Sequence, residues 1–189
     1  MKRLVVVLLL LLLCCYMSAQ RTHGLEAKFY GGRIVPHRLG MDALAQPSMA
    51  GEINYYFSTH TDNFYDVKYR FPKHGFGINY NYIWNHDVLG SACAAYSFMD
   101  FSLYEKNWFG LGLRVNAGLA YLTRKYDRET NPLNIAVSTN LCFYFNLGFN
   151  LVFKLPSDFA LRLSPGFLHY SNGAVKKPNL GLNDVFVSL

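Results

Sequence analysis

A strict alternation of side chains between Val137 and Lys154 constrains the fold of this chain more than any other feature. The even positions carry mostly small or polar residues. The odd positions are apolar and largely aromatic: Val137, Thr139, Leu141, Phe143, Phe145, Leu147, Phe149, Leu151 and Phe153. A period of two places alternate residues on opposite faces of an extended strand. The segment therefore predicts a long β-strand with one apolar face and one polar face.

The same alternation recurs along the rest of the chain, and no helix of any length is expected after the N-terminal region. Each repeat is long enough to be a strand, and turn-like segments separate the repeats. The pattern predicts eight strands, at residues 25–30, 50–58, 75–84, 91–103, 107–122, 136–153, 159–171 and 182–189. The last of these is shorter than the roughly 9–11 residues of a spanning strand. A truncated last strand is one interpretation of that length.

The composition of the two faces separates a membrane barrel from a soluble β-protein. The polar faces hold Gly, Asn, Ser and single Arg or Glu residues, whereas a soluble sandwich or a soluble lipid-binding barrel needs a surface rich in Lys and Glu. The apolar faces are aromatic, and the chain has 15 Phe and 14 Tyr. Strands in lipid must close all their hydrogen bonds, which favours a closed barrel. We therefore predict an all-β, eight-stranded antiparallel β-barrel, integral to the Gram-negative outer membrane.

The N-terminus has the pattern of a secretory signal peptide. Met1-Lys2-Arg3 supplies positive charge, and an apolar run at residues 4–13 follows. This run is shorter than a membrane-spanning helix requires. We expect cleavage after Ala19, with residues 1–19 as the signal and 20–189 as one barrel domain. Lipidation at Cys14 or Cys15 is the alternative, although Leu13 is a poor match to a lipoprotein cleavage site.

Cysteines and charge add little to the functional assignment. Cys93 and Cys142 remain after the signal, and we expect them to be unpaired, although export would permit one bridge. The formal net charge of +6 includes Lys2 and Arg3. No basic stripe indicates a nucleic-acid partner, and an anionic membrane surface fits a mild positive charge better.

No metal or cofactor site is expected from the sequence. His60, Asp62 and Asp66 lack ligand spacing and are interpreted as solvated loop residues. Gly31-Gly32 is interpreted as a turn, not a phosphate loop, because no helix follows. Residues 104–106 and 155–158 are expected to be periplasmic turns, and 123–135 and 172–181 to be external loops. The segment 58–74 is long for a periplasmic turn, so either it is a long turn or it contains a strand near residues 66–71.

The segment after residue 166 carries the strongest chemical signal. His169 and Ser171 are two residues apart on a predicted strand and therefore share a face. They continue the lipid-facing row, where polar groups are unfavourable for folding. A histidine beside a serine can serve as general base for a nucleophilic hydroxyl. The alternative is that the histidine anchors the strand among lipid headgroups and the serine opens a turn.

This segment also resembles the lipid A 3-O-deacylase (PagL) family, also known as acyloxyacyl hydrolase. The family pattern is His-x-Ser-Asn followed by Pro-Asn-x-Gly-x-Glu, and six of its positions recur here at the same spacing over fifteen residues. The matching residues are His169, Ser171, Asn172, Pro178, Asn179 and Gly181. The resemblance implies an eight-stranded outer-membrane barrel. It also implies an active site on the lipid-facing surface, and release of the ester-linked acyl chain at the 3-position of lipid A, within lipopolysaccharide.

The resemblance further implies a role for each residue. Ser171 is expected to be the nucleophile and His169 the general base. Asn172, with the backbone N–H groups near Gly173, is expected to support the oxyanion. Pro178, Asn179 and Gly181 are expected to shape the loop.

One position departs from the family pattern. Asn183 stands where the family has its acid, and an amide can orient an imidazole but cannot stabilise its charged form. Asp184 is the alternative acid only if a bulge shifts the strand register. Two hypotheses follow: an esterase acting on lipid A, and a non-catalytic structural or adhesive barrel that has lost the acid. A carboxylate within reach of His169 would favour the first.

Overall fold

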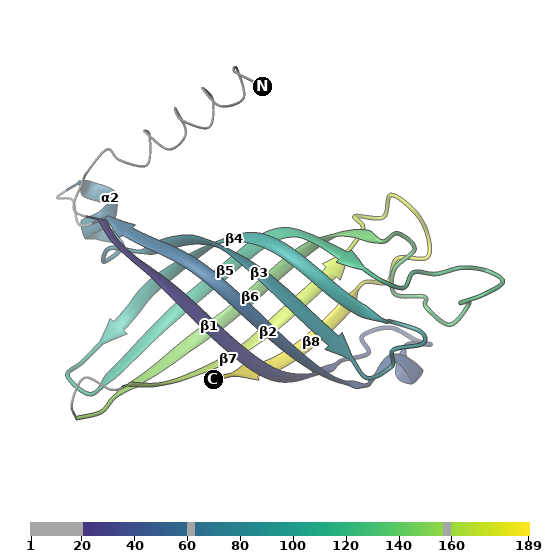
Figure 1. The fold of residues 1–189 in the computed structure, drawn as a ribbon, viewed down its shortest axis with the longest axis horizontal. Helices are drawn as coiled ribbons and strands as arrows, with labels where there is room; N and C mark the ends of the chain where they lie inside the picture. The colour runs from purple at the N-terminus through teal and green to yellow at the C-terminus, as the bar shows by residue number, and fades with distance from the viewer. Residues whose placement is uncertain (1–20, 60–62, 157–159) are drawn as a thin grey trace, which may run out of the picture.

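The computed structural model describes residues 21–59, 63–156 and 160–189. Strands follow one another around a closed antiparallel barrel in chain order (Figure 1). They are β1 (Arg21–Ile34), β2 (Pro47–Thr59), β3 (Lys73–Ile83), β4 (Ser91–Glu105), β5 (Phe109–Leu122), β6 (Leu141–Lys154), β7 (Ala160–Ser171) and β8 (Leu182–Ser188). β8 pairs with both β7 and β1, which closes the barrel. The predicted all-β, eight-stranded architecture is confirmed.

Helical structure is confined to two short pieces of the described chain, the 3-10 turn η1 (Asp42–Leu44) and the helix α2 (Phe64–Lys68). Neither is long or apolar enough to be a membrane-spanning helix. α2 replaces the strand that was one alternative for residues 66–71, so that alternative was wrong.

The alternating rows lie on the predicted faces of the barrel wall. In β6, Phe143 and Phe149 point outward with 59% and 46% of their surface exposed, whereas Tyr144 and Asn146 are buried inside. The pleat of a strand gives this separation, and the hydrocarbon phase of the membrane covers the outer row.

The start of the sixth strand was predicted wrongly. β6 begins at Leu141, and Val137 is fully buried in the preceding loop. The carbonyl of Val137 accepts a hydrogen bond from the N–H of Tyr126, and that of Ala136 accepts from Gly181. These loop contacts draw residues 136–138 over the end of the barrel, where they cannot continue the strand ladder.

The interior of the barrel is filled by polar side chains with paired charges. Glu26 forms ion pairs with Lys28 at 3.5 Å, with Arg114 at 2.6 Å and with Arg162. Arg114 also pairs with Asp100 at 2.9 Å. Buried charges persist when each has partners, and Lys28 has a second carboxylate partner in Glu52.

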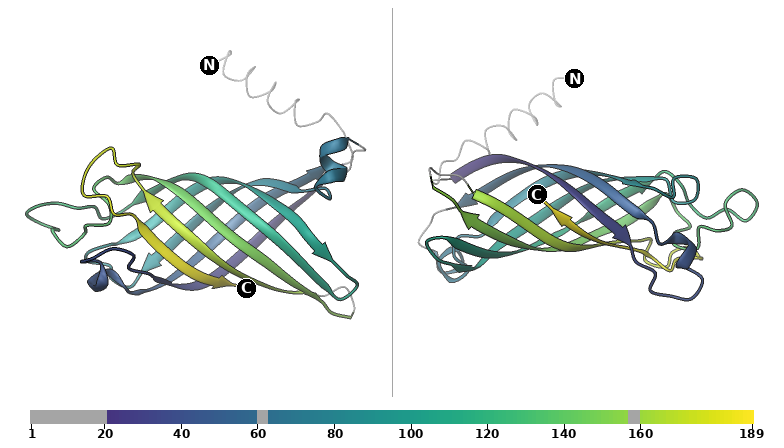
Figure 2. Two further views of the ribbon diagram at one scale, coloured as in Figure 1. Left: turned by 180° about the vertical axis from the view of Figure 1, so that it is seen from behind. Right: turned by 90° about the horizontal axis from the view of Figure 1, so that it is seen from below.

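The two ends of the barrel differ in the length of their connections. Long loops at residues 35–46, 123–140 and 172–181 gather at one end, whereas the connection from β4 to β5 at the other end is short (Figures 1 and 2). Outer-membrane barrels place short turns in the periplasm and longer loops outside. The end of β7 that carries Ser171 is therefore the extracellular end, and α2 lies at the periplasmic end.

Two further sequence interpretations were tested by the structure. Gly31 and Gly32 do not form a turn. Both lie within β1 and pair with residues of β2. A Cβ on Gly32 would lie 2.5 Å from Asp184 Oδ1, so the glycine makes room for that inward-facing carboxylate. Cys93 is exposed and Cys142 is buried, and both are free thiols, as expected. The predicted signal peptide, His60 and Asp62 lie outside the described residues. Asp66 was interpreted wrongly as a solvated loop residue, because it is buried in α2.

Candidate active site

His169 and Ser171 lie on the outer surface of the barrel, close to the extracellular end of β7. Both side chains are half-buried. Tyr170, which lies between them, and Leu168, which precedes His169, are fully buried inside the barrel. The alternation of β7 thus turns both polar side chains toward the membrane. Phe145 of β6 pairs with His169 in the sheet and leaves an aromatic, apolar surround for the site.

The imidazole of His169 is oriented by β8. His169 pairs with Asn183 in the sheet, and its Nδ1 lies 2.6 Å from Asn183 Oδ1. An amide oxygen accepts hydrogen bonds, so this contact favours the tautomer in which Nδ1 carries the proton. Nε2 is then left with a lone pair and can accept a proton from a hydroxyl group.

Two neighbours restrict the position of the imidazole ring. Gly181 has a φ of +80°, and a Cβ there would lie 2.6 Å from His169 Cε1. Only glycine combines this backbone conformation with such a close approach. Phe167 stacks beside the imidazole, with ring centroids 6.4 Å apart.

Asp184 lies on the opposite face of β8. It is fully buried in the barrel and its Oδ2 accepts a hydrogen bond from Asn81 Nδ2 at 3.1 Å. The β7–β8 register is continuous from Ser164–Ser188 to Tyr170–Leu182, without a bulge. The alternative in which Asp184 serves as the acid for His169 does not agree with this placement, since strand pleating points the two side chains apart.

The hydroxyl of Ser171 is held by two hydrogen-bond donors. Gly173 N–H donates to Ser171 Oγ at 3.2 Å, and Asn179 Nδ2 donates to it at 2.9 Å. Asn179 Oδ1 in turn accepts from the Asn172 N–H at 3.0 Å, which fixes the amide with its NH₂ group toward the serine. Both donors point at the nucleophilic oxygen itself, and they can serve an oxyanion once a bound ester places its carbonyl oxygen beside Ser171 Oγ.

The position of Asn179 shows what the motif spacing missed. Asn179 was expected only to shape the loop, because its spacing from Ser171 indicates nothing about side-chain direction. The Asn172 side chain, expected to support the oxyanion, instead turns away and donates to Ser138 Oγ at 3.1 Å and Lys176 O at 2.9 Å. Pro178 immediately precedes Asn179 in the loop.

The external loops hold this arrangement in place. Ser138 Oγ donates to Lys176 O at 2.6 Å, and the N–H of Gly181 donates to Ala136 O at 2.9 Å. The residues wrongly predicted to begin the sixth strand thus support the loop that carries Asn179 and Gly181.

Within the described part of the chain, Ser171 and His169 make no direct hydrogen bond to each other. Catalytic hydrogen bonds are often long in the absence of substrate and tighten in the complex. The two side chains share a face two residues apart, so a rotation of the hydroxyl or the ring can bring them together.

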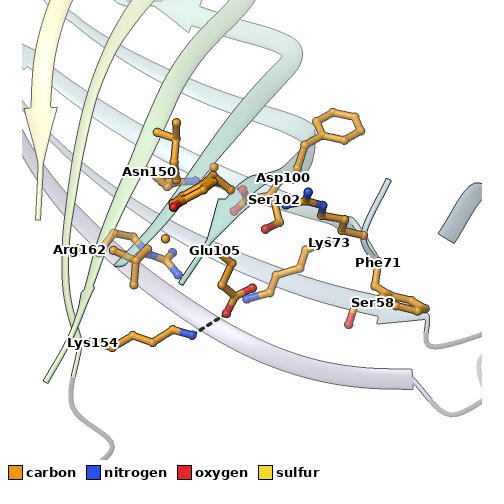
Figure 3. A pocket seen from close by; sticks show the side chains of 16 residues that line it. Ser58, Phe71, Lys73, Asp100, Ser102, Glu105, Asn150, Lys154 and Arg162 are labelled. Atoms are coloured by element: carbon orange, nitrogen blue, oxygen red, sulfur yellow. Dashed lines mark hydrogen bonds and ion pairs between the residues drawn. The ribbon is translucent and has the colours of Figure 1, made fainter. Parts of the chain in front are cut away.

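A cavity of about 510 Å³ opens at the other end of the barrel. Figure 3 shows Arg162, Lys73 and Glu105 around it, with Glu105 bonded to Lys154 at 2.5 Å. Its lining includes serines and charged side chains but no histidine or cysteine, whereas at the outer site a serine shares a face with an oriented histidine. Over residues 21–59, 63–156 and 160–189, no three potential metal ligands come together. The outer site is therefore the stronger candidate for chemistry.

Comparisons with known proteins found a matching family and a similar fold. A family model described as "Lipid A 3-O-deacylase (PagL)" matches residues 49–189, which is more than half of the chain and includes the whole site. A solved structure, "Crystal structure of the outer membrane enzyme PagL", is similar with a TM-score of 0.55 and 12% sequence identity, covering 87% of this chain and 99% of that one. At this identity the likeness concerns the fold alone. The comparison with curated proteins found no match.

Proposed function

The chain belongs to the lipid A 3-O-deacylase (PagL) family, and we propose that it removes the ester-linked acyl chain at the 3-position of lipid A. It is an integral protein of the Gram-negative outer membrane. Its substrate is then lipopolysaccharide of the outer leaflet, and no cofactor takes part.

The observation that carries this proposal is the position of the Ser171 hydroxyl. It faces the membrane beside an oriented imidazole, and Gly173 and Asn179 hold it with two donors. A lipid ester at the boundary between headgroup and acyl chains can reach such a hydroxyl from within the leaflet. A soluble substrate would have no reason to meet a site on the hydrocarbon face.

The geometry supports a two-step acyl transfer. Ser171 Oγ attacks the ester carbonyl while His169 Nε2 accepts the hydroxyl proton. The oxyanion of the tetrahedral intermediate is stabilised by the Gly173 N–H and the Asn179 amide. The intermediate collapses, and the imidazolium returns its proton to the departing 3-oxygen of lipid A. Water then hydrolyses the acyl-serine ester by the same route.

Asn183 reduces the rate expected of this site. Its amide oxygen can keep the proton on Nδ1 of His169, but it has no charge to stabilise the imidazolium. Cys-His-Asn proteases operate with an amide in this position, although a thiol is an easier nucleophile than a hydroxyl. We therefore propose a slow esterase.

The same residue favours a second candidate function, a non-catalytic structural or adhesive barrel. In that case the fold and the loop remain, and Asn183 marks the loss of the acid. The two candidates differ in one observable, which is whether lipid A loses an acyl chain in cells that make this protein.

Mass spectrometry of lipid A from cells expressing the protein tests the proposal. We compare the wild type with Ser171→Ala and with Ser97→Ala, a matched change at an outward-facing serine of β4. The wild type and Ser97→Ala should remove one hydroxyacyl chain from the 3-position, and Ser171→Ala should leave lipid A intact. Intact lipid A with the folded wild type would favour the non-catalytic barrel.

A further inference from the structure

The segment that follows α2 contacts an edge of β4 that β3 leaves unpaired. β3 begins at Lys73, which pairs with Asp100, so the residues of β4 beyond Asp100 have no partner on that side. Tyr69, which follows α2, packs edge-on against Phe101 with ring centroids 6.1 Å apart. An uncovered strand edge exposes unpaired backbone groups, which the α2 segment protects.

A β-bulge in β4 fixes the position of Arg70 on this edge. The register with β5 passes from Ser102–Gly112 to Tyr104–Leu111 and leaves Leu103 unpaired. The carbonyl of Leu103 accepts a hydrogen bond from Arg70 Nη1 at 3.2 Å. The bulge thus frees a backbone acceptor that holds the arginine against the outer wall of the barrel.

The backbone around Arg70 is held in an unusual conformation. Arg70 has a φ of 56° and Phe71 a φ of 54°, both in the left-handed region that non-glycine residues rarely adopt. The N–H of Phe71 donates to Asp66 O at 2.7 Å, and Asn63 caps the helix through the Asp66 N–H at 2.8 Å.

Beside Arg70 the outer wall has a hollow of about 370 Å³, which adjoins the cavity in the barrel mouth and shares Arg70, Phe101 and Ser102 with it. Apolar side chains form most of its lining, and Lys68 and Arg70 form its cationic rim. The lining apolar residues are Tyr69, Phe101, Leu103 and Leu113. Trp108, in the adjacent turn, is 61% exposed, as is typical of aromatic residues at the membrane–water interface.

The two cations of the rim have no acidic partner in the described part of the chain. Lys68 Nζ lies over the Phe64 ring at 5.1 Å and over the Tyr69 ring at 5.7 Å. Nearby carboxylates are already engaged: Glu105 pairs with Lys154, Asp100 pairs with Arg114, and Asp66 accepts from Asn63 Nδ2. Lys68 and Arg70 are therefore available to an anion from the membrane.

We propose that this hollow binds an anionic phospholipid of the inner leaflet. The phosphate lies on the guanidinium of Arg70 and the ammonium of Lys68, and the first part of an acyl chain packs against Leu103 and Leu113. Arg binds phosphate oxygens through two parallel hydrogen bonds, and cationic side chains beside an aromatic interfacial segment attract anionic lipid. The site lies at the opposite end of the barrel from Ser171 and does not depend on the deacylase proposal.

Native mass spectrometry of the full-length protein in detergent tests the proposal, with phosphatidylglycerol and phosphatidylcholine as the added lipids. The folded wild type should retain one phosphatidylglycerol in preference to phosphatidylcholine. Arg70→Gln and Lys68→Gln should each weaken phosphatidylglycerol binding by about five-fold, the effect of removing one basic contact to an anionic lipid surface. Lys106→Gln, at an exposed lysine in the neighbouring turn, should leave binding unchanged.

Three results would overturn the proposal. They are equal retention of the two lipids, an equal loss in Lys106→Gln, and displacement of phosphatidylglycerol by soluble glycerol 3-phosphate at the same concentration. The last would mean that the rim recognises free phosphate rather than lipid. If Arg70→Gln disturbs the loop, Lys68→Gln still tests the proposal. In the described structure the Lys68 side chain contacts the rings of Phe64 and Tyr69 and holds no backbone group of the loop.

Discussion

His169 and Asn183 face each other across β7 and β8, with Nδ1 of the imidazole 2.6 Å from the amide oxygen. A neutral amide thus occupies the position from which an acid would orient and stabilise the histidine. In the proposed mechanism, this contact keeps the proton on Nδ1 of His169 but adds no charge to stabilise the imidazolium, so we expect slow deacylation.

Asn183→Glu should raise the rate of lipid A deacylation. A carboxylate at this position accepts from Nδ1 and also stabilises the imidazolium that forms when Ser171 loses its proton. Replacing the acid by an amide in a related triad costs about 10⁴-fold, partly through the tautomer, so we expect a gain of about ten-fold or more. The assay is acyl release from purified lipid A in detergent.

Asp184→Asn is the control for that experiment. Its side chain is buried inside the barrel, so the rate should not change. An unchanged rate in Asn183→Glu together with a strong loss in Asp184→Asn would mean that Asp184 is the acid and that the β8 register differs from the one described.

Gly181→Ala should lower the activity while the barrel still assembles. The added Cβ would lie 2.6 Å from His169 Cε1, at a backbone φ of +80°, so either the ring or the loop must move. Gly31→Ala is the matched control, because a Cβ there meets nothing within 4 Å. The measurement compares the deacylation rates of the two folded variants. Equal rates would mean that Gly181 does not position the imidazole.

Phe149→Arg should destabilise the folded barrel in lipid vesicles. Phe149 lies in the middle of β6 with 46% of its surface exposed toward the membrane. A charge on the lipid face near the midplane costs about 2–4 kcal/mol, whereas Phe149→Leu should cost far less. Urea unfolding of the wild type, Phe149→Arg and Phe149→Leu gives the free energy of unfolding of each protein. Equal stabilities would contradict the assignment of this row to lipid.

Glu26→Gln should be strongly destabilising. It removes a carboxylate that Lys28, Arg114 and Arg162 share, although Lys28 keeps Glu52 and Arg114 keeps Asp100. Breaking a buried pair costs about 3–5 kcal/mol when the remaining charge is left unpaired, so we expect a loss of up to that size. Glu105→Gln removes the exposed pair with Lys154 and should cost less than about 1 kcal/mol. The same urea titration measures both, and a loss in Glu105→Gln as large as in Glu26→Gln would contradict the account of the interior.

The sequence predicted the faces of the strands better than their ends. The alternation is local, so the outward direction of Phe143 and Phe149 could be derived from it. Strand ends depend on distant contacts: β1 continues through Gly32 because it pairs there with Phe186 of β8, and β6 starts late because Gly181 binds Ala136. Neither partner is adjacent in sequence.

In the candidate site, too, the strand residues could be predicted from the sequence and the loop contacts could not. The strand period places His169 and Ser171 on one face, and antiparallel pairing brings Asn183 beside the histidine. The contact of Asn179 with Ser171 could not be predicted, because the path of a ten-residue loop from 172 to 181 depends on its hydrogen bonds to Ser138 and Ala136.

We propose that Ser171 cleaves an acyl ester of lipid A on the outer surface of the barrel. The most direct measurement is acyl release from purified lipid A by the folded wild type and by folded Ser171→Ala. We expect slow release of the 3-linked acyl chain by the wild type and none above background by Ser171→Ala. Equal release by the two proteins would contradict it.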